Sequence, residues 1–302
     1  MAKITNKFGL SQALVDLVNE SQYRPHEHSY SATTLLNPTR YILLSRRHFD
    51  DVEVDVNQMM NMVLGTAVHS LIEKFDKTGF AEVYMKREIY PNYYLSGKID
   101  LYDEANNTLV DYKTASVYKI TKQDFEDWRK QGLIYAYLLI ADGHYVSKLK
   151  FHAILKDWSA RELRKAKLHN EFYPEAQVYT WEYVVTTADL IEIENFVKDK
   201  FKELIECENM PDNYLPDCPK EDTWYTGDKF AIYKDEQSYK DEKKATKLCD
   251  TLEEAQGYIR MKMKNVGYIV ERKGEYRKCQ DYCTYCKFCK YYEERKVKDG
   301  EE

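Results

Sequence analysis

Apolar residues recur at helical spacing in two early segments of the chain, 31–48 and 55–77. In the first segment, Ser31 is expected to cap the helix, and Pro38 to restart it, because proline suits a first helical turn. The second segment is expected to form a longer helix. Its apolar face consists of Met59, Met62, Val63, Val68, Leu71, Ile72 and Phe75.

The pattern then changes to alternation of apolar and polar residues, which predicts three strands near 83–89, 99–101 and 108–113. Turn residues at 91–92 and 104–107 suit short antiparallel connections. The elements expected next are a helix that begins near Thr121 or Asp124 and runs to 141, strands at 146–155 and 178–185, and a helix at 187–207.

This order favours an α/β fold with a mixed central sheet flanked by helices, because no crossover helices separate the first three strands. Closely spaced prolines at 211–219 indicate a boundary. We therefore expect an N-terminal helical segment at 1–54, a core at 55–210, and a small Cys-rich α+β appendage at 211–302. Within the appendage, 234–256 is expected to form a pair of surface helices.

Composition narrows the class of protein. The 302 residues include 45 Lys+Arg and 51 Asp+Glu, for a net charge of -6, and 43% are hydrophobic, as in ordinary globular proteins. No apolar run approaches the roughly 18 residues of a membrane helix, and the N-terminus lacks the apolar core of a signal peptide. We expect a cytoplasmic protein, in which the 7 Cys are thiols or metal ligands rather than disulfides.

The candidate chemistry lies on the second and third strands. Asp111 and Lys113 share one strand face, while Tyr112 points the other way. If these strands pair as a hairpin, Asp100 converges on the same site, and two nearby carboxylates favour a divalent cation between them. Carboxylates suit Mg²⁺, and an imidazole such as His69 shifts the preference towards Mn²⁺.

Such a site suits phosphodiester hydrolysis. Lys113 would orient the attacking water or stabilise negative charge, and Gln131 and Tyr135 share one helix face beside it. Each short motif alone is weak, because an Asp-x-Lys on a strand is usually a solvated ion pair. Their joint order on helix, strand, strand and helix favours a functional site over a set of surface residues.

In that order, the motifs Gly65-Thr-Ala-Val-His69, Gly97-Lys-Ile-Asp100, Asp111-Tyr-Lys113 and Gln131-Gly-Leu-Ile-Tyr135 resemble the PD-(D/E)XK nuclease superfamily. They are most similar to its RecB-like branch, which includes phage recombination exonucleases and CRISPR-associated nucleases with a cysteine cluster. The resemblance covers about 31–155 and implies a restriction-endonuclease-like core. It also implies that the metal ligands are His69, Asp100, Asp111 and the backbone carbonyl of Tyr112, that Lys113 is the catalytic lysine, and that Gln131 and Tyr135 support it.

Cysteines cluster near the C-terminus at Cys279, Cys283, Cys286 and Cys289, and Cys218 lies in the proline-rich boundary. This density predicts a metal site, either zinc or iron-sulfur. The resemblance implies a 4Fe-4S cluster held by three C-terminal cysteines and a distant one, for which we select Cys218, Cys279, Cys283 and Cys289. In that branch the distant cysteine usually precedes the nuclease motifs, whereas none precedes Cys207 here. Cys286 remains a competitor, because its spacing to Cys283 and Cys289 is that of ferredoxin ligands. Cys207 and Cys249 are expected on helices as buried residues.

Residues 141–170 contain seven Lys or Arg and three acids, a local balance of +4. This segment either follows a nucleic-acid backbone, with Trp158 and Tyr173 as stacking faces, or forms a solvated surface. The expected function is a metal-dependent DNA nuclease, an exonuclease acting on ends or single strands in phage-type recombination or repair. The preference for DNA ends and a single-strand annealing protein as partner come from the resemblance alone. The alternatives are an inactive DNA-binding module on a nuclease fold and a zinc-stabilised scaffold.

Overall fold

The structure, a computed structural model, describes residues 2–21, 26–75 and 80–295. The chain forms two compact units, Met1–Met210 and Pro211–Glu302. Each unit is described by itself. Within the described residues, no helix is long and apolar enough to cross a lipid bilayer.

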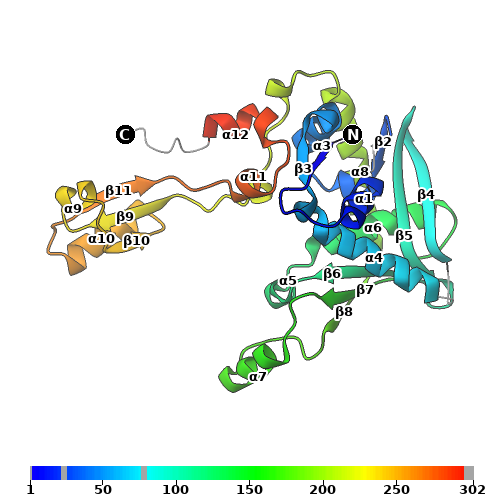
Figure 1. Ribbon diagram of the computed structural model, residues 1–302, viewed down its shortest axis with the longest axis horizontal. Helices are drawn as coiled ribbons and strands as arrows, with labels where there is room; N and C mark the ends of the chain where they lie inside the picture. Colours follow the sequence, from blue (N-terminus) through cyan, green and yellow to red (C-terminus); the bar gives the residue numbers. More distant parts are fainter. Residues whose placement is uncertain (1, 22–25, 76–79, 296–302) are drawn as a thin grey trace. The chain divides into compact units, whose positions relative to one another are not determined.

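A six-stranded mixed sheet is the framework of the first unit (Figure 1). Its strands are β2 (Ser29–Ser31), β4 (Phe80–Tyr90), β5 (Tyr93–Asp103), β6 (Thr108–Ala115), β7 (Lys148–Leu155) and β8 (Val178–Val184). The order is β2-β5-β6-β7-β8, and β4 also pairs with β5. The pairs β2/β5 and β6/β7 are parallel, and the β4/β5, β5/β6 and β7/β8 pairs are antiparallel. This arrangement confirms the mixed α/β prediction.

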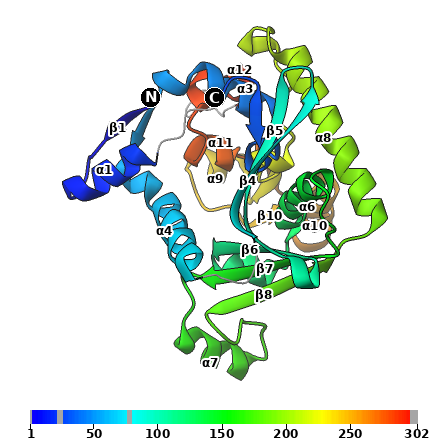
Figure 2. The ribbon, with the colours of Figure 1, turned by 90° about the vertical axis from the view of Figure 1, so that its right-hand side faces the viewer.

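Helices lie on both sides of this sheet (Figure 2). The helix α6 (Glu126–Ala141) packs Gly132 against Leu149 and Phe151 of β7. The helix α4 (Met60–Phe75) places Gly65 against Thr114 of β6. The side chain of Thr114 points to the face of the sheet opposite to α6. A third long helix, α8 (Thr187–Cys207), packs on α6. The hydrophobic core therefore lies mainly between the sheet and α6, where alternate residues of β7 are buried.

The N-terminal segment contains strands as well as the expected helices. Ser31 caps α2 (Ala32–Leu35), and α3 (Thr39–Arg47) begins directly after Pro38, as predicted. However, β1 (Lys3–Thr5) pairs with β3 (Glu53–Asp55), and β2 joins the central sheet. The other elements are α1 (Gln12–Glu20) and the short helix η1 (Phe49–Asp51).

The predicted helix at 55–77 corresponds to two elements. Asp55 caps the short helix η2 (Val56–Met59), which continues into α4. Its predicted end at Lys77 lies outside the described residues. The turn between β4 and β5 contains Asn92 at φ 68°, and a short helix, η3 (Glu104–Asn106), connects β5 to β6.

Of the two predicted starts of the next helix, Thr121 was wrong, whereas Asp124 lies two residues before the observed start and the predicted end at 141 is confirmed. Thr121 lies inside a separate helix, α5 (Val117–Lys122). Ser116 caps this helix, because its side-chain oxygen accepts a hydrogen bond from the N–H of Lys119. The following helix α6 starts at Glu126, whose N–H donates to Asp124 at 3.4 Å. The basic segment contributes one more helix, α7 (Ala160–His169), between β7 and β8.

The second unit contains a small antiparallel sheet. Its strands are β9 (Lys229–Tyr233), β10 (Lys247–Cys249) and β11 (Tyr268–Arg272), in the order β10-β9-β11. Its helices are η4 (Asp212–Tyr214), η5 (Glu221–Thr223), α9 (Glu236–Lys240), α10 (Leu252–Lys262), α11 (Arg277–Asp281), η6 (Cys286–Phe288) and α12 (Lys290–Arg295).

Two expectations for this part of the chain were wrong. Residues 234–256 form a strand between two helices rather than a helical pair, and Cys249 lies on that strand. Cys249 is buried because it packs with Ile232 and Ala255 in a small core. Cys207 is buried at the end of α8, as predicted.

Candidate metal centre

His69 and Asp100 meet where α4 crosses the sheet. Nδ1 of His69 lies 3.1 Å from Oδ1 of Asp100. This hydrogen bond raises the pKa of His69, although burial lowers it. The charges of Asp100 and Asp111 also raise this pKa. The sequence motifs at Gly65–His69 and Gly97–Asp100 are thus brought together by tertiary structure.

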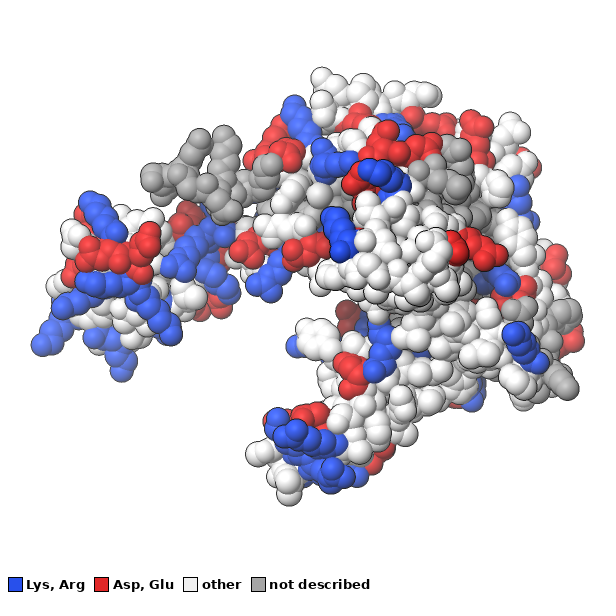
Figure 3. Space-filling model, in the orientation of Figure 1, with Lys and Arg blue, Asp and Glu red and all other residues white. Residues whose placement is uncertain are grey.

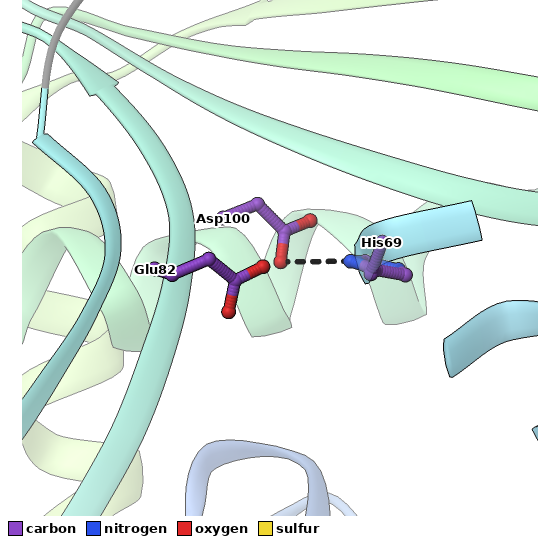
Figure 4. A group of neighbouring side chains, drawn as sticks. All are labelled: His69, Glu82 and Asp100. Carbon is purple, nitrogen blue, oxygen red and sulfur yellow. Dashed lines mark hydrogen bonds and ion pairs between the residues drawn. The ribbon is translucent and has the colours of Figure 1, made fainter. Parts of the chain in front are cut away.

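Glu82 of β4 is a third member of this group. Its carboxylate, the imidazole of His69 and the carboxylate of Asp100 each offer an atom within 4.8 Å of the others (Figure 4). Ala81 pairs with Leu101 and Val83 with Ile99, so Glu82 stands opposite Asp100. Its backbone adopts a left-handed conformation at φ 55°. A non-glycine residue in this conformation costs about 1–2 kcal/mol, and such strain tends to occur at functional sites.

Asp100 occupies a fork in the sheet. The β5/β6 ladder includes Leu101 with Val110 and ends there. Beyond this point Oδ2 of Asp100 accepts a hydrogen bond from the N–H of Tyr112 at 2.8 Å. Past the end of the β5/β6 ladder, a side-chain oxygen of β5 thus accepts this N–H, and the contact fixes Asp100 beside β6.

Asp111 and Lys113 form a buried ion pair next to the fork. Nζ of Lys113 lies 2.7 Å from Oδ2 of Asp111. Burial raises the pKa of Asp111 to about 6, although the charge of Lys113 opposes this shift. Burial lowers the pKa of Lys113, but the charge and hydrogen bond of Asp111, together with the charges of Tyr135 and Asp100, outweigh burial and raise this pKa.

Gln131 and Tyr135 of α6 hold Lys113 from the other side. Nζ of Lys113 donates to Oε1 of Gln131 at 2.8 Å, and Nε2 of Gln131 donates to the hydroxyl of Tyr135 at 3.0 Å. Burial and the nearby charge of Asp111 raise the pKa of Tyr135. The pair at i and i+4 therefore acts as one support for the lysine, as its spacing predicts.

An open cavity of about 390 Å³ leads to the group. It is lined by Gly65, Thr66, His69, Ser70, Glu82, Lys98 and Asp100. Lys98 forms an ion pair with Glu82. A small polar ligand or a metal with its waters has access from this side.

The structure thus places all the predicted core residues in one region, with His69 and Asp100 in direct contact and Asp111, Lys113, Gln131 and Tyr135 in a connected network. A ligand role for the carbonyl of Tyr112 stays a prediction. The sequence analysis missed Glu82. Glu82 joins the group through the pairing register of β4 with β5, and no short sequence motif indicates that register.

The cysteine cluster belongs to the second unit. Cys279 lies on α11 and Cys286 on η6, while backbone hydrogen bonds at 3.1 and 3.0 Å connect Cys283, Cys286 and Cys289 in sequence. Burial and the neighbouring thiols raise the pKa of Cys279 to about 12. Cys218 is half-buried and acts electrostatically on Tyr291 of α12.

Comparisons with known proteins give only remote structural similarities. No family model matches the chain, and no curated protein matches it. A protein designated SSO0001 is 16% identical with a TM-score of 0.45, covering 66% of this chain and 87% of that one. LHK-Exo in complex with dAMP is 12% identical with a TM-score of 0.36, covering 59% and 89%. A phage-related exonuclease from Haemophilus somnus 129PT is 11% identical with a TM-score of 0.27, covering 66% and 85%.

Proposed function

We propose that this protein is a divalent-metal-dependent nuclease whose site lies at the β5/β6 fork. The observation that carries the proposal is the convergence of His69, Glu82 and Asp100 within 4.8 Å beside the buried Asp111–Lys113 pair. The order of the four motifs, similar to that of RecB-like PD-(D/E)XK nucleases, supports it.

The donor set fits a divalent ion. Two carboxylates and one imidazole suit Mn²⁺, and the carboxylates with waters suit Mg²⁺. Asp111 adds a buried carboxylate, and its Oδ2 already lies 2.7 Å from the ammonium of Lys113. A bound ion would supply a polarised phosphoryl oxygen and a more acidic water.

The residues of the chain have separate roles in this proposal. His69, Glu82, Asp100 and Asp111 hold the ion. Lys113 directs its ammonium at the attacking water or at the phosphate, where negative charge develops. Gln131 and Tyr135 are positioning residues, because they reach the reaction only through Lys113.

The proposed substrate is DNA, at ends or in single strands, with recombination or repair in a phage-type system as the setting. A cytoplasmic location and a single-strand annealing protein as partner belong to the same proposal, and both rest on the motif resemblance. The alternative is a DNA-binding module without catalysis. The intact Asp111–Lys113–Gln131 network favours the enzyme.

End-labelled linear DNA, single- and double-stranded, provides the test. With Mg²⁺ or Mn²⁺ the wild type should degrade it and spare a covalently closed circle, and EDTA should stop the reaction. Asp111→Asn and Lys113→Ala should each lower the rate by more than about 100-fold. Asp103→Asn on the same strand as Asp100 is the matched control, because Asp103 only caps η3.

A wild type that retains labelled DNA and never cuts it with metal present would replace the nuclease proposal by the binding-module alternative. Cleavage that survives Asp111→Asn would place the reaction elsewhere in the chain.

We also propose a 4Fe-4S cluster in the second unit, held by Cys218, Cys279, Cys283 and Cys289. Thiol donors concentrated in one short segment fit either iron-sulfur or zinc. Anaerobically purified protein should be brown and contain iron and acid-labile sulfide, whereas a colourless protein with stoichiometric zinc would contradict the proposal. Cys286→Ser should keep the cluster, and Cys289→Ser should lose it.

A further inference from the structure

One face of the sheet beyond β6 is open. Burial alternates along β8, so that Val178, Thr180, Glu182 and Val184 are exposed. Neighbouring residues of β7 on this face, Lys148, Lys150, His152 and Ile154, are half-buried. The side chains of β7 that point to the other face, towards α6, are buried. We call the exposed side of β7 and β8, with Tyr112 of β6, the open face.

The centre of the open face is an aromatic pair. Tyr112 and His152 are partners in the β6/β7 register, and their rings stack with centroids 5.8 Å apart and planes 22° apart. His152 Nδ1 lies 3.0 Å from the hydroxyl of Thr180, which fixes the ring. Half-buried aromatic rings on an open sheet are a surface on which unpaired bases stack.

Positive charge surrounds this pair. Lys148 and Lys150 share a single acid, Glu182, at 3.3 and 3.2 Å, which leaves one excess positive charge. The helix α7 adds Arg161, Arg164, Lys165 and Lys167. Lys165 pairs with Glu162 and Lys167 with Glu175, so this group leaves an excess of two positive charges. Figure 3 shows Lys and Arg gathered over the part of the molecule where Figure 1 labels α7. This charge complements a phosphate backbone.

The segment from 156 to 176, here called the arm, is held together by hydrogen bonds between its two ends. Trp158 Nε1 donates to the carbonyl of Pro174 at 2.9 Å, and the N–H of Ser159 donates to the hydroxyl of Tyr173 at 3.0 Å. Ser159 also caps α7. Trp158 and Tyr173, considered above as stacking faces, therefore hold the arm together, and the stacking role passes to the Tyr112–His152 pair.

The arm and the open face connect directly to the metal centre. At the base of the arm, Lys156 Nζ donates to Asn61 of α4 at 2.7 Å, and α4 carries His69. At the other end, the backbone of Tyr112 bonds Asp100, and Tyr112 lies between Asp111 and Lys113. The side chains of Asp111 and Lys113 point to the opposite face of β6 from Tyr112. A strand on the open face would therefore reach them past the fork where β5 and β6 separate.

We propose that the open face and the arm bind a single strand of DNA, with an unpaired base stacked on the Tyr112–His152 pair and the phosphates along α7. The proposal deepens the proposed function, because it names the path by which a strand reaches that site. Unlike the proposed function, it predicts binding that does not depend on a divalent ion.

The test is fluorescence anisotropy of the full-length protein with a labelled single-stranded oligonucleotide in EDTA, repeated over a range of salt. Arg161→Glu/Arg164→Glu changes two exposed arginines on α7. Lys198→Glu/Lys202→Glu on α8 makes the same charge change on an exposed part of a helix that packs on α6. Circular dichroism and thermal unfolding confirm that each variant is folded.

The arm pair should raise the dissociation constant roughly tenfold and reduce the slope of log K against log salt by about 1.4, since each phosphate contact on a single strand contributes roughly 0.7. The α8 pair should change neither. His152→Ala should weaken binding about fivefold or more by removing a stacking surface, and should leave the slope unchanged.

Arm variants that bind like the α8 pair would overturn the proposal, as would a wild type that does not bind the oligonucleotide. Either result leaves the nuclease proposal to be decided by the cleavage of end-labelled DNA. Conversely, a protein that never cleaves but shows the predicted change of slope would keep the binding surface and lose the nuclease.

Discussion

Gly97→Ala tests how β5 supports the hydrogen-bonded network of Lys113, Gln131 and Tyr135. A Cβ at this position would lie 2.8 Å from Cε1 and 3.0 Å from Cδ1 of Tyr135, and 3.1 Å from Cδ1 of Leu138. Tyr135 and Leu138 are both buried on α6. The ring cannot retreat without moving the hydroxyl that accepts from Gln131.

The magnitude follows from this geometry. Overpacking a closely packed core by one methyl group costs about 1–3 kcal/mol, and contacts at or below 3.1 Å with two buried side chains place Gly97→Ala in the upper half of that range. Movement of Tyr135 would also loosen Gln131 and hence Lys113, so that the rate of DNA cleavage should fall by about tenfold or more.

Urea unfolding and the end-labelled DNA assay measure the two effects. The control is Gly257→Ala on α10, where a Cβ meets nothing within 4 Å and helix propensity should stabilise the protein by up to about 1 kcal/mol. If Gly97→Ala unfolds at the same urea concentration as the wild type and cleaves at the same rate, the close packing of β5 on Tyr135 is not the reason for a glycine at 97.

Two further predictions concern Glu82 and Asp189. Glu82→Gly should relieve the left-handed backbone and raise the free energy of unfolding by about 1 kcal/mol, while Mn²⁺ binding measured by calorimetry weakens about tenfold or more. Unchanged Mn²⁺ affinity would remove Glu82 from the ligand set. Asp189 accepts hydrogen bonds from Tyr183, Thr186 and Arg129, which together outweigh burial and lower its pKa. A lowered folded pKa adds stability that is present above the unfolded value of about 3.9 and is lost as pH falls through the folded pKa. Asp189→Asn should therefore cost about 1 kcal/mol at neutral pH and progressively less in acid, and a cost that is independent of pH would contradict this assignment.

Local sequence patterns predicted most of the sheet and its long helices because their signals are short-range. Ser31 and Pro38 mark helix starts through capping and backbone restriction, and both act as predicted. The helix α5 was missed because Thr121 and Asp124 also look like caps, and the local pattern does not show that Ser116 caps an earlier turn. In the appendage, β10 is only three residues long and too short to show alternation.

The site was predicted as far as strand alternation extends. Strand periodicity alone predicts that Asp111 and Lys113 share a face. In the structure they also form an ion pair, and this pair is buried rather than solvated. Glu82 depends instead on the register between two strands and on a left-handed residue, neither of which has a local signature. Tertiary packing likewise decides that Trp158 and Tyr173 join parts of the arm rather than face a ligand.

The separation of β5 and β6 at the fork explains why two carboxylates can lie close together in this site. It also affects what a mutation of Asp100 tests. If the β5/β6 ladder continued past Leu101 and Val110, Asp100 and Asp111 would be direct cross-strand partners, an unfavourable arrangement for like charges. Because the strands separate, Asp100 turns one oxygen to the N–H of Tyr112 and the other to His69. Asp100→Ala would thus remove the acceptor of a backbone N–H as well as the proposed metal ligand. Loss of cleavage in that variant does not separate the two roles. Lys113→Ala keeps the fork but leaves the buried carboxylate of Asp111 without its ion-pair partner, so its free energy of unfolding has to be measured beside its rate of cleavage.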